Sequence, residues 1–366
     1  MNQEIKDLIE ITRFADQVPE LVQGAGGNTS VKSQDNKVIH IKASGFCLNE
    51  LNETTGHLAL NLERLLRIVE DKSYNSLDYA KQQERSATEM KECSIEQSPI
   101  RPSLETGFHA ILAKYVIHTH PIYVNALTCA EDADRIRLLK TLEDKIGPVI
   151  WINYRPPGHP LARLIADSLK GLKAASGSMP CTILLKNHGL ITSSDSMEEA
   201  KALHANCIAA CTEIFGKLND SEYKIDLAED KKITSHLLEN YPCVKACSDK
   251  YINYALKNSI LKSSEIKPLV PDDAVYWGNS ILLLVNLVRP ATERQGIIIT
   301  QNLDTFVVAQ KESLLKPIED SFTANIRIRL IARNHAKISP LSEEQIAFIT
   351  GMEGEKYRQA LGAKIL

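Results

Sequence analysis

The chain has 366 residues, 43% of them hydrophobic, enough for one large core or for the cores of two average domains. Its formal charge of −3 excludes the basic surface that nucleic acid requires, although an anion could still bind at a local site. No segment reaches the ~18 uninterrupted apolar residues of a membrane span. The N-terminus is an acidic amphipathic segment and no signal peptide, so we expect a cytoplasmic protein.

The first hundred residues predict two helices, a hairpin and an insertion. Apolar spacing predicts a helix over residues 3–22, which leads into the glycine-rich turn GAGGNTS at residues 24–30. The alternating segment of residues 31–45 predicts a β-hairpin that turns at QDN, and LERLLRIVE at residues 62–70 predicts a short helix. Residues 71–100 are polar and charged with few large apolar side chains, which is typical of an exposed insertion or mobile loop.

The middle of the chain alternates between helical and extended patterns. Helical spacing begins at residue 103 in SLETGFHAILAKY, and YVIHTHPI at residues 115–122 predicts a strand that ends at a proline. TILLKNHGLITSS at residues 182–194 also reads as extended chain. A long helix is expected from about Ser196 to Leu218, where SMEE resembles a capping box.

Beyond about residue 220 the sequence predicts a folded α/β region with little obvious chemistry. Apolar strands are expected at SILLLVNLV, GIIIT and TFVVAQ, followed by a helix from about Glu312 to His335. We therefore expect a catalytic domain over residues 1–220 and a C-terminal α/β region of unknown role over residues 221–366.

LLKNHGLITSSDSMEEAK and IIITQNLDTFVVAQKESLL share one order of elements, which is strand, polar turn, strand and helix start. If the second is a degenerate internal copy of the first, Asn302 and Leu303 replace the turn that holds His188, and the copy lacks a metal ligand. The order is a common one, so a chance likeness stays open.

Eight cysteines without CxxC pairs indicate reduced thiols in a chain of this length. Cys207 and Cys211 are four residues apart, as are Cys243 and Cys247, so each pair would share one face of a helix. Such a pair can bind a metal or act as a redox couple. Small apolar side chains on a buried helix face explain the spacing more simply.

Three histidines form the most specific pattern in the chain. His118 and His120 are two apart in VIHTHP, so on an extended strand both imidazoles point to one face. With His188 in LLKNHGL they could form a three-histidine metal site with an open position, the arrangement of a catalytic metal. Zinc suits such ligands at ~2.1 Å, although manganese or iron could occupy the same nitrogens.

A carboxylate precedes the histidine pair in RPSLETGFH. Glu105 begins a predicted helix and could merely interact with the helix dipole. Beside a metal it is placed to remove a proton alpha to a bound carbonyl, which requires a pKa raised toward neutrality by a dry pocket. His109, one turn later, is a candidate for the outer shell of the site, for a fourth ligand or for plain packing.

The glycine-rich turn could bind an anion through converging backbone N–H groups. Asn28, Thr29 and Ser30 add side-chain donors, and the segment is neither a Walker motif nor a dinucleotide fingerprint. A second small loop at residues 43–45 and Ser103 supply further donors. Together these segments predict a phosphate or carboxylate pocket.

These motifs, in this order, resemble the class II aldolase/adducin family. The resemblance covers roughly residues 5–218 through GAGGNTSVK, KASGF, RPSLETGFH, VIHTHP, YRPPGHPLA and LLKNHGLIT. Within the family, the chain is most similar to the aldolase part of bifunctional rhamnulose-1-phosphate aldolase/alcohol dehydrogenase proteins, because RPSLET, HTHP and the later PDDAVYWG are shared. Since no dinucleotide fingerprint appears, the oxidoreductase activity is not expected here.

The resemblance implies a three-layer αβα fold with a central, mostly antiparallel sheet, Zn²⁺ or another divalent metal, and a homotetramer. It implies reversible aldol cleavage of a ketose, such as a ketose 1-phosphate, into an aldehyde and a dihydroxyacetone-type fragment through a zinc-stabilised enediolate. The partner would be a small sugar or sugar phosphate, without nucleic acid or membrane. The implied site residues are the metal ligands His118, His120 and His188, the general acid/base Glu105, and the phosphate-binding Asn28, Ser44, Gly45 and Ser103.

The sequence departs from the family pattern at one phosphate position. Leu104 stands where a second serine usually precedes the glutamate, and an apolar side chain cannot donate to a phosphate oxygen. The family's acid tyrosine has no motif, and Tyr154 is a guess. An epimerase, which usually has an aspartate in place of Glu105, a dehydratase and a decarboxylase stay open. So does an adducin-like interaction module, which would not be expected to keep all three metal ligands.

Overall fold

The computed structural model describes residues 2–18, 20–176, 181–219, 223, 231–278, 281–284 and 295–352. Its larger sheet has seven strands in the order β3-β2-β1-β4-β7-β6-β5, and only β5 and β6 pair in parallel. The expected mostly antiparallel central sheet is therefore confirmed. The strands are β1 (Asn28–Lys32), β2 (Val38–Lys42), β3 (His57–Asn61), β4 (Tyr115–Thr119), β5 (Ile150–Ile152), β6 (Cys181–Leu185) and β7 (Gly189–Ser194).

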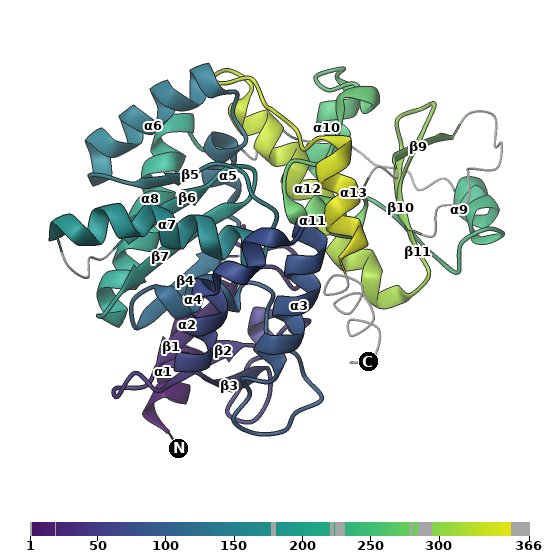
Figure 1. The fold of residues 1–366 in the computed structure, drawn as a ribbon. Coiled ribbons are helices and arrows are strands. Elements are labelled where there is room, and N and C mark those ends of the chain that lie inside the picture. Colours follow the sequence, from purple (N-terminus) through teal and green to yellow (C-terminus); the bar gives the residue numbers. More distant parts are fainter. Residues whose placement is uncertain are drawn as a thin grey trace.

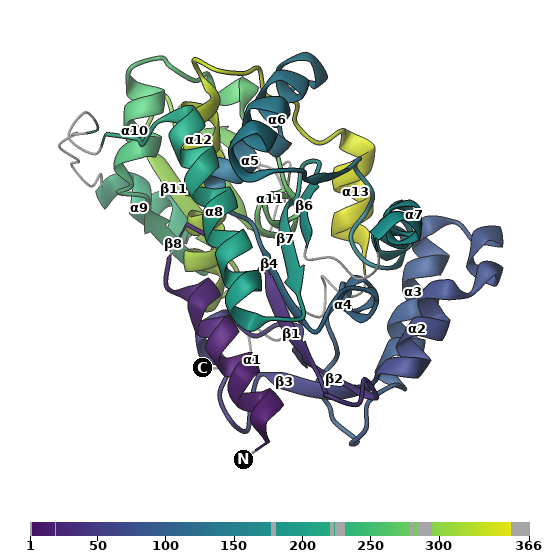
Figure 2. The same ribbon diagram turned by 90° about the vertical axis from the view of Figure 1, so that its left-hand side faces the viewer.

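Helices cover both faces of this sheet, which gives three layers (Figures 1 and 2). One face carries α1 and α8, and the other carries α4 and α7, with α2 and α3 packed outside them. Helices α5 and α6 lie beside α8. The helices are α1 (Gln3–Asp16), α2 (Leu62–Glu70), α3 (Tyr79–Lys91), α4 (Thr106–Ile111), α5 (Ile122–Thr128), α6 (Asp132–Ile146), α7 (His159–Ser176) and α8 (Met197–Phe215).

Strand register brings distant segments together at one place. β1 pairs with β2 in the expected hairpin, and on its other side Asn28 pairs with His118 of β4. Opposite residues of antiparallel strands carry their side chains on the same face. β4 also pairs with β7, and the β6–β7 turn contains Asn187, whose φ is 53°, and His188. The sheet therefore places Asn28, His118 and His188 close to one another.

A second sheet of four strands, in the order β8-β11-β10-β9, follows the first. Figure 1 shows α11, α12 and α13 between the two sheets. The elements of this region are β8 (Cys243–Ala246), β9 (Ile281–Leu284), β10 (Gly296–Thr300), β11 (Thr305–Ala309), α9 (Lys231–Leu238), α10 (Lys250–Lys257), α11 (Pro271–Tyr276), α12 (Glu312–Ala332) and α13 (Glu343–Gly351).

One apolar core is shared by the two regions. Ile122 and Leu127 of α5 belong to the same buried cluster as Leu269, which precedes α11, and Ile328 of α12. Since this cluster draws on both regions, the C-terminal region is tied firmly to the seven-stranded sheet. The domain boundary near residue 220 stays a prediction.

The proposed internal copy has the expected elements, because both segments form a hairpin followed by a helix. Each turn contains a non-glycine residue with positive φ, Asn187 at 53° and Leu303 at 65°. Common ancestry of the two segments stays a prediction.

Residues 71–100 are not the loop that the sequence predicts. They contain α3, whose Asp78 caps the helix by accepting a hydrogen bond from the Lys81 N–H at 2.8 Å. Met90 is 1% exposed, while the equally buried Gln83 accepts a hydrogen bond from the His159 backbone N–H. The apolar period is weak because part of the buried face is polar and is stabilised by hydrogen bonds.

Two smaller expectations are also corrected, and a third is confirmed. The first helix ends at Asp16 and not near residue 22. Cys243 begins strand β8, so Cys243 and Cys247 do not share a helix face. Cys207 and Cys211 are buried in the shared core on α8, as the packing interpretation predicts, and all eight cysteines are free.

Within the described ranges, no helix combines the length and hydropathy that crossing a membrane demands.

Asp273 joins α11 to α12. Its buried carboxyl accepts hydrogen bonds from the Leu269 N–H at 2.8 Å, from Ser321 Oγ at 2.8 Å and from Asn325 Nδ2 at 2.6 Å. Burial raises the pKa of this carboxyl from 3.8 to about 6, because the hydrogen bonds only partly offset the loss of water.

We expect a pH-dependent contribution of Asp273 to stability. Because its folded pKa is raised, the contribution is fully present below pH 3.8 and is lost as the pH rises through about 6. Between about pH 5 and about pH 8 the wild type should lose about 1–2 kcal/mol of unfolding free energy more than Asp273→Asn, which cannot titrate. Urea denaturation measures both, and equal losses would contradict the assignment.

Candidate metal centre

Three imidazoles meet in the interior of the molecule. His118 lies on β4, His120 follows directly after this strand, and His188 lies in the β6–β7 turn. One ring nitrogen of each lies within 4.8 Å of the others, and all three side chains are buried. His118 Nε2 and His120 Nε2 are 3.0 Å apart. The structure therefore brings together the three histidines that the sequence singled out.

The outer nitrogens of two rings are held by partners that orient them. His118 Nδ1 donates to the Leu190 carbonyl oxygen at 2.9 Å, and His120 Nδ1 is bound by the Asp272 carboxylate. In the neutral rings, each Nε2 then carries a lone pair directed into the cluster. Two lone pairs at 3.0 Å repel each other, whereas nitrogens around a shared tetrahedral cation are separated by about 3.4 Å. This donor set fits a divalent cation.

The Glu105 carboxylate faces this cluster and is only 6% exposed. Its Oε1 lies 3.2 Å from His188 Nε2, and its Oε2 lies 3.5 Å from His118 Nε2. Oε2 also accepts a hydrogen bond from Asn28 Nδ2 at 2.7 Å. Among the described residues, Oε1 has no hydrogen-bond partner of good geometry. A buried anionic oxygen in this position is a further feature that suits a cation.

The ionisation of Glu105 differs from the expectation. Burial raises the pKa of this carboxyl, but positive charge on the imidazoles of His118 and His188 outweighs burial and lowers the pKa well below its usual range. The pKa is thus lowered and not raised as the sequence led us to expect, and a cation held by neutral rings would likewise keep Glu105 ionised. An ionised carboxylate can accept a proton or contact a cation directly.

A chain of hydrogen bonds fixes Asn28, and through it Glu105. His109 Nε2 donates to Asn28 Oδ1, and Ser30 Oγ donates to His109 Nδ1 at 2.7 Å. Burial lowers the pKa of His109 to about 3, so this ring is neutral. Of the three roles considered for His109, the contacts favour support of the site from outside the metal cluster.

The sequence did not identify Asp272 as a site residue. It lies on α11, 152 positions from His120, and it is 1% exposed. A carboxylate on the outer nitrogen of a histidine fixes the tautomer and orientation of the ring and makes it a stronger ligand. The signal was present in PDDAVYWG, where two acidic residues follow a proline, but nothing local relates that segment to a histidine so far away.

The residues that were expected to bind phosphate border little open space, and two of them, Asn28 and Ser103, are hydrogen-bonded to each other. Ser103 Oγ accepts hydrogen bonds from the Glu105 N–H at 3.2 Å and from Asn28 Nδ2 at 3.4 Å. Ser44 and Ser103 line a small cavity of about 20 Å³, and Gly45 has a φ of 86°. Tyr154 follows β5, and its buried hydroxyl has no hydrogen-bond partner within the described part of the chain. Within the described residues, no hydrogen bond or ring contact joins Tyr154 to the three histidines.

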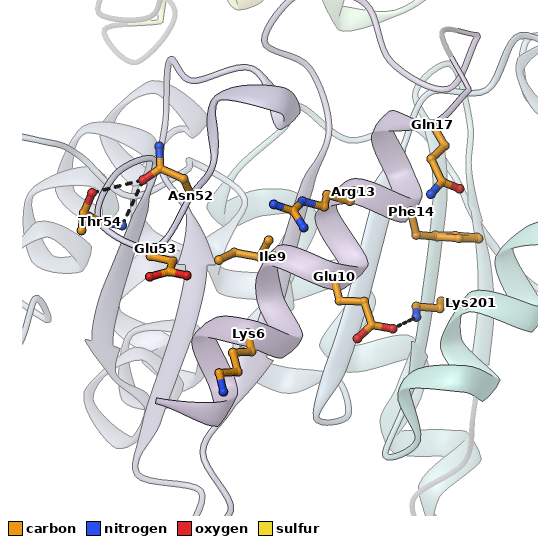
Figure 3. A pocket seen from close by; sticks show the side chains of 10 residues that line it. All are labelled: Lys6, Ile9, Glu10, Arg13, Phe14, Gln17, Asn52, Glu53, Thr54 and Lys201. Carbon is orange, nitrogen blue, oxygen red and sulfur yellow. Dashed lines mark hydrogen bonds and ion pairs between the residues drawn. The ribbon is translucent and has the colours of Figure 1, made fainter. Parts of the chain in front are cut away.

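A wider pocket of about 920 Å³ lies elsewhere, between α1, residues 52–54 and Lys201 of α8 (Figure 3). Its charges are mixed, and Glu10 pairs with Lys201 across it. None of the residues that line it belongs to the histidine cluster. This pocket is therefore separate from the candidate metal centre.

Comparison with known proteins matches residues 6–214 to the family model described as the class II aldolase and adducin N-terminal domain. An uncharacterized oxidoreductase from Bacillus subtilis is 28% identical over 184 residues, which are 47% of this chain and 24% of that protein. A 3-oxo-tetronate 4-phosphate decarboxylase from Escherichia coli is 25% identical over 203 residues, which are 52% of this chain and 77% of that protein. The chain thus spans about a quarter of the Bacillus relative.

Among solved structures, the N-terminal class II aldolase domain of a conserved protein from Thermoplasma acidophilum has a TM-score of 0.47 and 24% identity, and covers 58% of this chain and 94% of that chain. A putative aldolase/epimerase/decarboxylase from Klebsiella pneumoniae has a TM-score of 0.41 and 21% identity. The match covers 64% of this chain and 97% of that chain. The narrower similarity to rhamnulose-1-phosphate aldolase/alcohol dehydrogenase proteins stays a prediction.

We expect Asp272→Asn to weaken metal binding, because an amide is a poorer acceptor for the His120 Nδ1–H. Loss of such an outer-shell carboxylate lowers metal affinity by about 10–100-fold. Competition of the protein with a chromophoric zinc chelator measures the change. Asp167→Asn, which alters a carboxylate that is 55% exposed, is the matched control. Equal zinc affinity of the two variants would remove Asp272 from the metal centre.

Proposed function

Because this chain belongs to the class II aldolase and adducin family, with residues 6–214 forming the N-terminal domain, we propose that it is a divalent-metal-dependent carbon–carbon lyase. In this proposal it cleaves a ketose reversibly into an aldehyde and a dihydroxyacetone-type fragment. The observation that carries the proposal is the buried Glu105 carboxylate beside the three clustered imidazoles, 3.2 Å from His188 Nε2 and 3.5 Å from His118 Nε2.

His118, His120 and His188 would hold the cation, for which we propose Zn²⁺ because three imidazoles and an open position suit it. When bound, the cation supplies Lewis-acid polarisation of a substrate carbonyl. The Leu190 carbonyl oxygen and the Asp272 carboxylate hold the Nδ1 atoms of His118 and His120, which would leave the Nε2 atoms available to such a cation. Other divalent ions remain within the proposal.

Glu105 would move the proton on the carbon next to the substrate carbonyl. Asn28 holds Oε2, so Oε1 is the oxygen that can reach a substrate. In condensation, ionised Glu105 accepts the proton from this carbon, and the aldehyde oxygen gains a proton as it becomes a hydroxyl. In cleavage, that hydroxyl gives up its proton as the carbon–carbon bond breaks, and protonated Glu105 returns a proton to the carbon. Because Glu105 and the three rings are buried, bulk water competes little for this proton.

Decarboxylation is the second candidate, supported by the Escherichia coli decarboxylase that the chain resembles. In that reaction the carbon–carbon bond to a carboxylate breaks, so no C–H proton is removed first. Glu105, once protonated, would instead deliver a proton to the carbon that loses carbon dioxide. Incubation with 3-oxo acids, with release of carbon dioxide as the readout, separates this candidate from aldol cleavage. The epimerase and dehydratase alternatives would release neither an aldehyde nor carbon dioxide.

The alternative to an enzymatic function is a non-catalytic protein-interaction module. Metal analysis of the purified protein addresses it, because absence of bound divalent metal even after reconstitution would favour it. A homotetramer belongs to the proposal as well, and light scattering on the purified protein tests that part.

We expect His120→Ala to abolish metal binding and turnover together, because one of three ligands is removed. The loss should exceed the roughly 100-fold effect of an outer-shell change. Metal content and aldehyde formation are measured in parallel, with His57→Ala on β3 as the matched control. Full turnover of the wild type in excess chelator would contradict the metal-dependent assignment.

Glu105→Gln should leave metal bound while stopping proton transfer, because an amide cannot accept the proton. The rate of hydrogen–deuterium exchange at the alpha carbon of the dihydroxyacetone-type fragment should fall by about 10²–10⁴-fold. Proton NMR in deuterated water follows the exchange. Exchange at the wild-type rate would exclude Glu105 from this step.

A further inference from the structure

The glycine-rich turn, which the sequence marks as an anion site, is occupied by side chains of α11. The Ala25 N–H donates a hydrogen bond to the Tyr276 hydroxyl at 3.0 Å. A Cβ built on Gly24 would lie 2.3 Å from this hydroxyl oxygen, and one on Gly26 would lie 2.9 Å from Asp272 Oδ2. The turn therefore lacks side chains where α11 rests on it, and a carboxylate of the chain itself lies against its backbone.

Leu104 also contacts the C-terminal region. Its partly buried side chain packs against the apolar cluster of that region, which includes Tyr276 and Val275 of α11. A serine at this position would offer a hydroxyl to a phosphate, whereas leucine offers only apolar contact. Leu104, which looked like a missing phosphate donor in the sequence, thus serves the packing of the C-terminal region.

Little space remains beside Leu104. Ser44, Arg101 and Ser103 line the adjoining cavity together with Leu104, and its volume is about 20 Å³. This is about the space that one water molecule needs. A phosphate group, with four oxygens around phosphorus, is several times larger.

We propose that α11 replaces a substrate phosphate at the glycine-rich turn, so that the site selects an unphosphorylated ketose. This inference rests on the proposed lyase function and narrows its substrate class. Three contacts act in the same direction: Tyr276 uses the Ala25 N–H, Asp272 places a negative charge where an anion would bind, and Leu104 supplies no donor.

The hydroxyls of Ser44 and Ser103 suit a sugar hydroxyl, because each can both donate and accept a hydrogen bond. An uncharged sugar end pairs with such groups without the like-charge repulsion that a phosphate would meet beside Asp272.

The test compares two mimics of the activated three-carbon fragment that differ by one phosphate, glycolohydroxamate and phosphoglycolohydroxamate. Titration calorimetry on the zinc-loaded full chain should find that the phosphorylated mimic binds no tighter than its parent. Tighter binding of the phosphorylated mimic by about tenfold or more would overturn the proposal. Binding of neither mimic to protein with proven zinc content would instead contradict the lyase function, and this inference with it.

The double variant Leu104→Ser, Tyr276→Phe should shift the preference toward the phosphorylated mimic by about tenfold or more, because it exposes the Ala25 N–H and adds a donor. Tyr79→Phe, which removes a hydroxyl from a residue that is 41% exposed, is the matched control and should leave the ratio of affinities unchanged. If the double variant does not fold, Leu104→Ser alone is measured, and an unshifted ratio in the folded variant contradicts the proposal.

Discussion

The contact between the His120 imidazole and the Asp272 carboxylate joins the two regions of the chain at the metal centre. It depends on the position of α11, which two arrangements determine. The apolar cluster shared by α5 and α12 includes Leu269 just before α11, and Asp273 is bonded to Ser321 and Asn325 of α12. Breaking these buried contacts would expose apolar side chains and leave buried polar groups without hydrogen bonds. The C-terminal region is therefore a fixed part of the histidine site and not only a cover over it.

Charge balance explains why so many ionisable groups tolerate burial at one point. Glu105 and Asp272 bring two carboxylates to the three imidazoles, and a divalent cation would balance the charge of the two carboxylates. Buried charges persist in proteins when they are paired or bind metals. The residues that hold Glu105 in place are neutral. Asn28 is an amide, and burial keeps His109, which binds Asn28, uncharged. The electrostatics and the geometry of the histidine cluster thus both favour a divalent cation.

In our proposals, metal binding and substrate choice depend on different parts of the molecule. The family match ends at residue 214, and all three candidate ligands and Glu105 lie before that point. Asp272 and Tyr276 lie after it, yet they contact the ligand His120 and the glycine-rich turn. Under these proposals, a region outside the family domain shapes the substrate pocket beside the candidate metal ligands.

Sequence periodicity alone located the elements that hold the ligands, because local spacing decides which side chains share a face of a strand. The histidine motifs and the resemblance to the family, and not periodicity, singled out His118, His120, His188 and Glu105. Periodicity missed α3, whose buried face is partly polar. It also missed Asp272, which is 152 positions from its partner. Such a pair exists only after α12 has packed on α5, and no local pattern encodes that approach. Tertiary packing, and not residue spacing, therefore decided how His120 is held and what fills the glycine-rich turn.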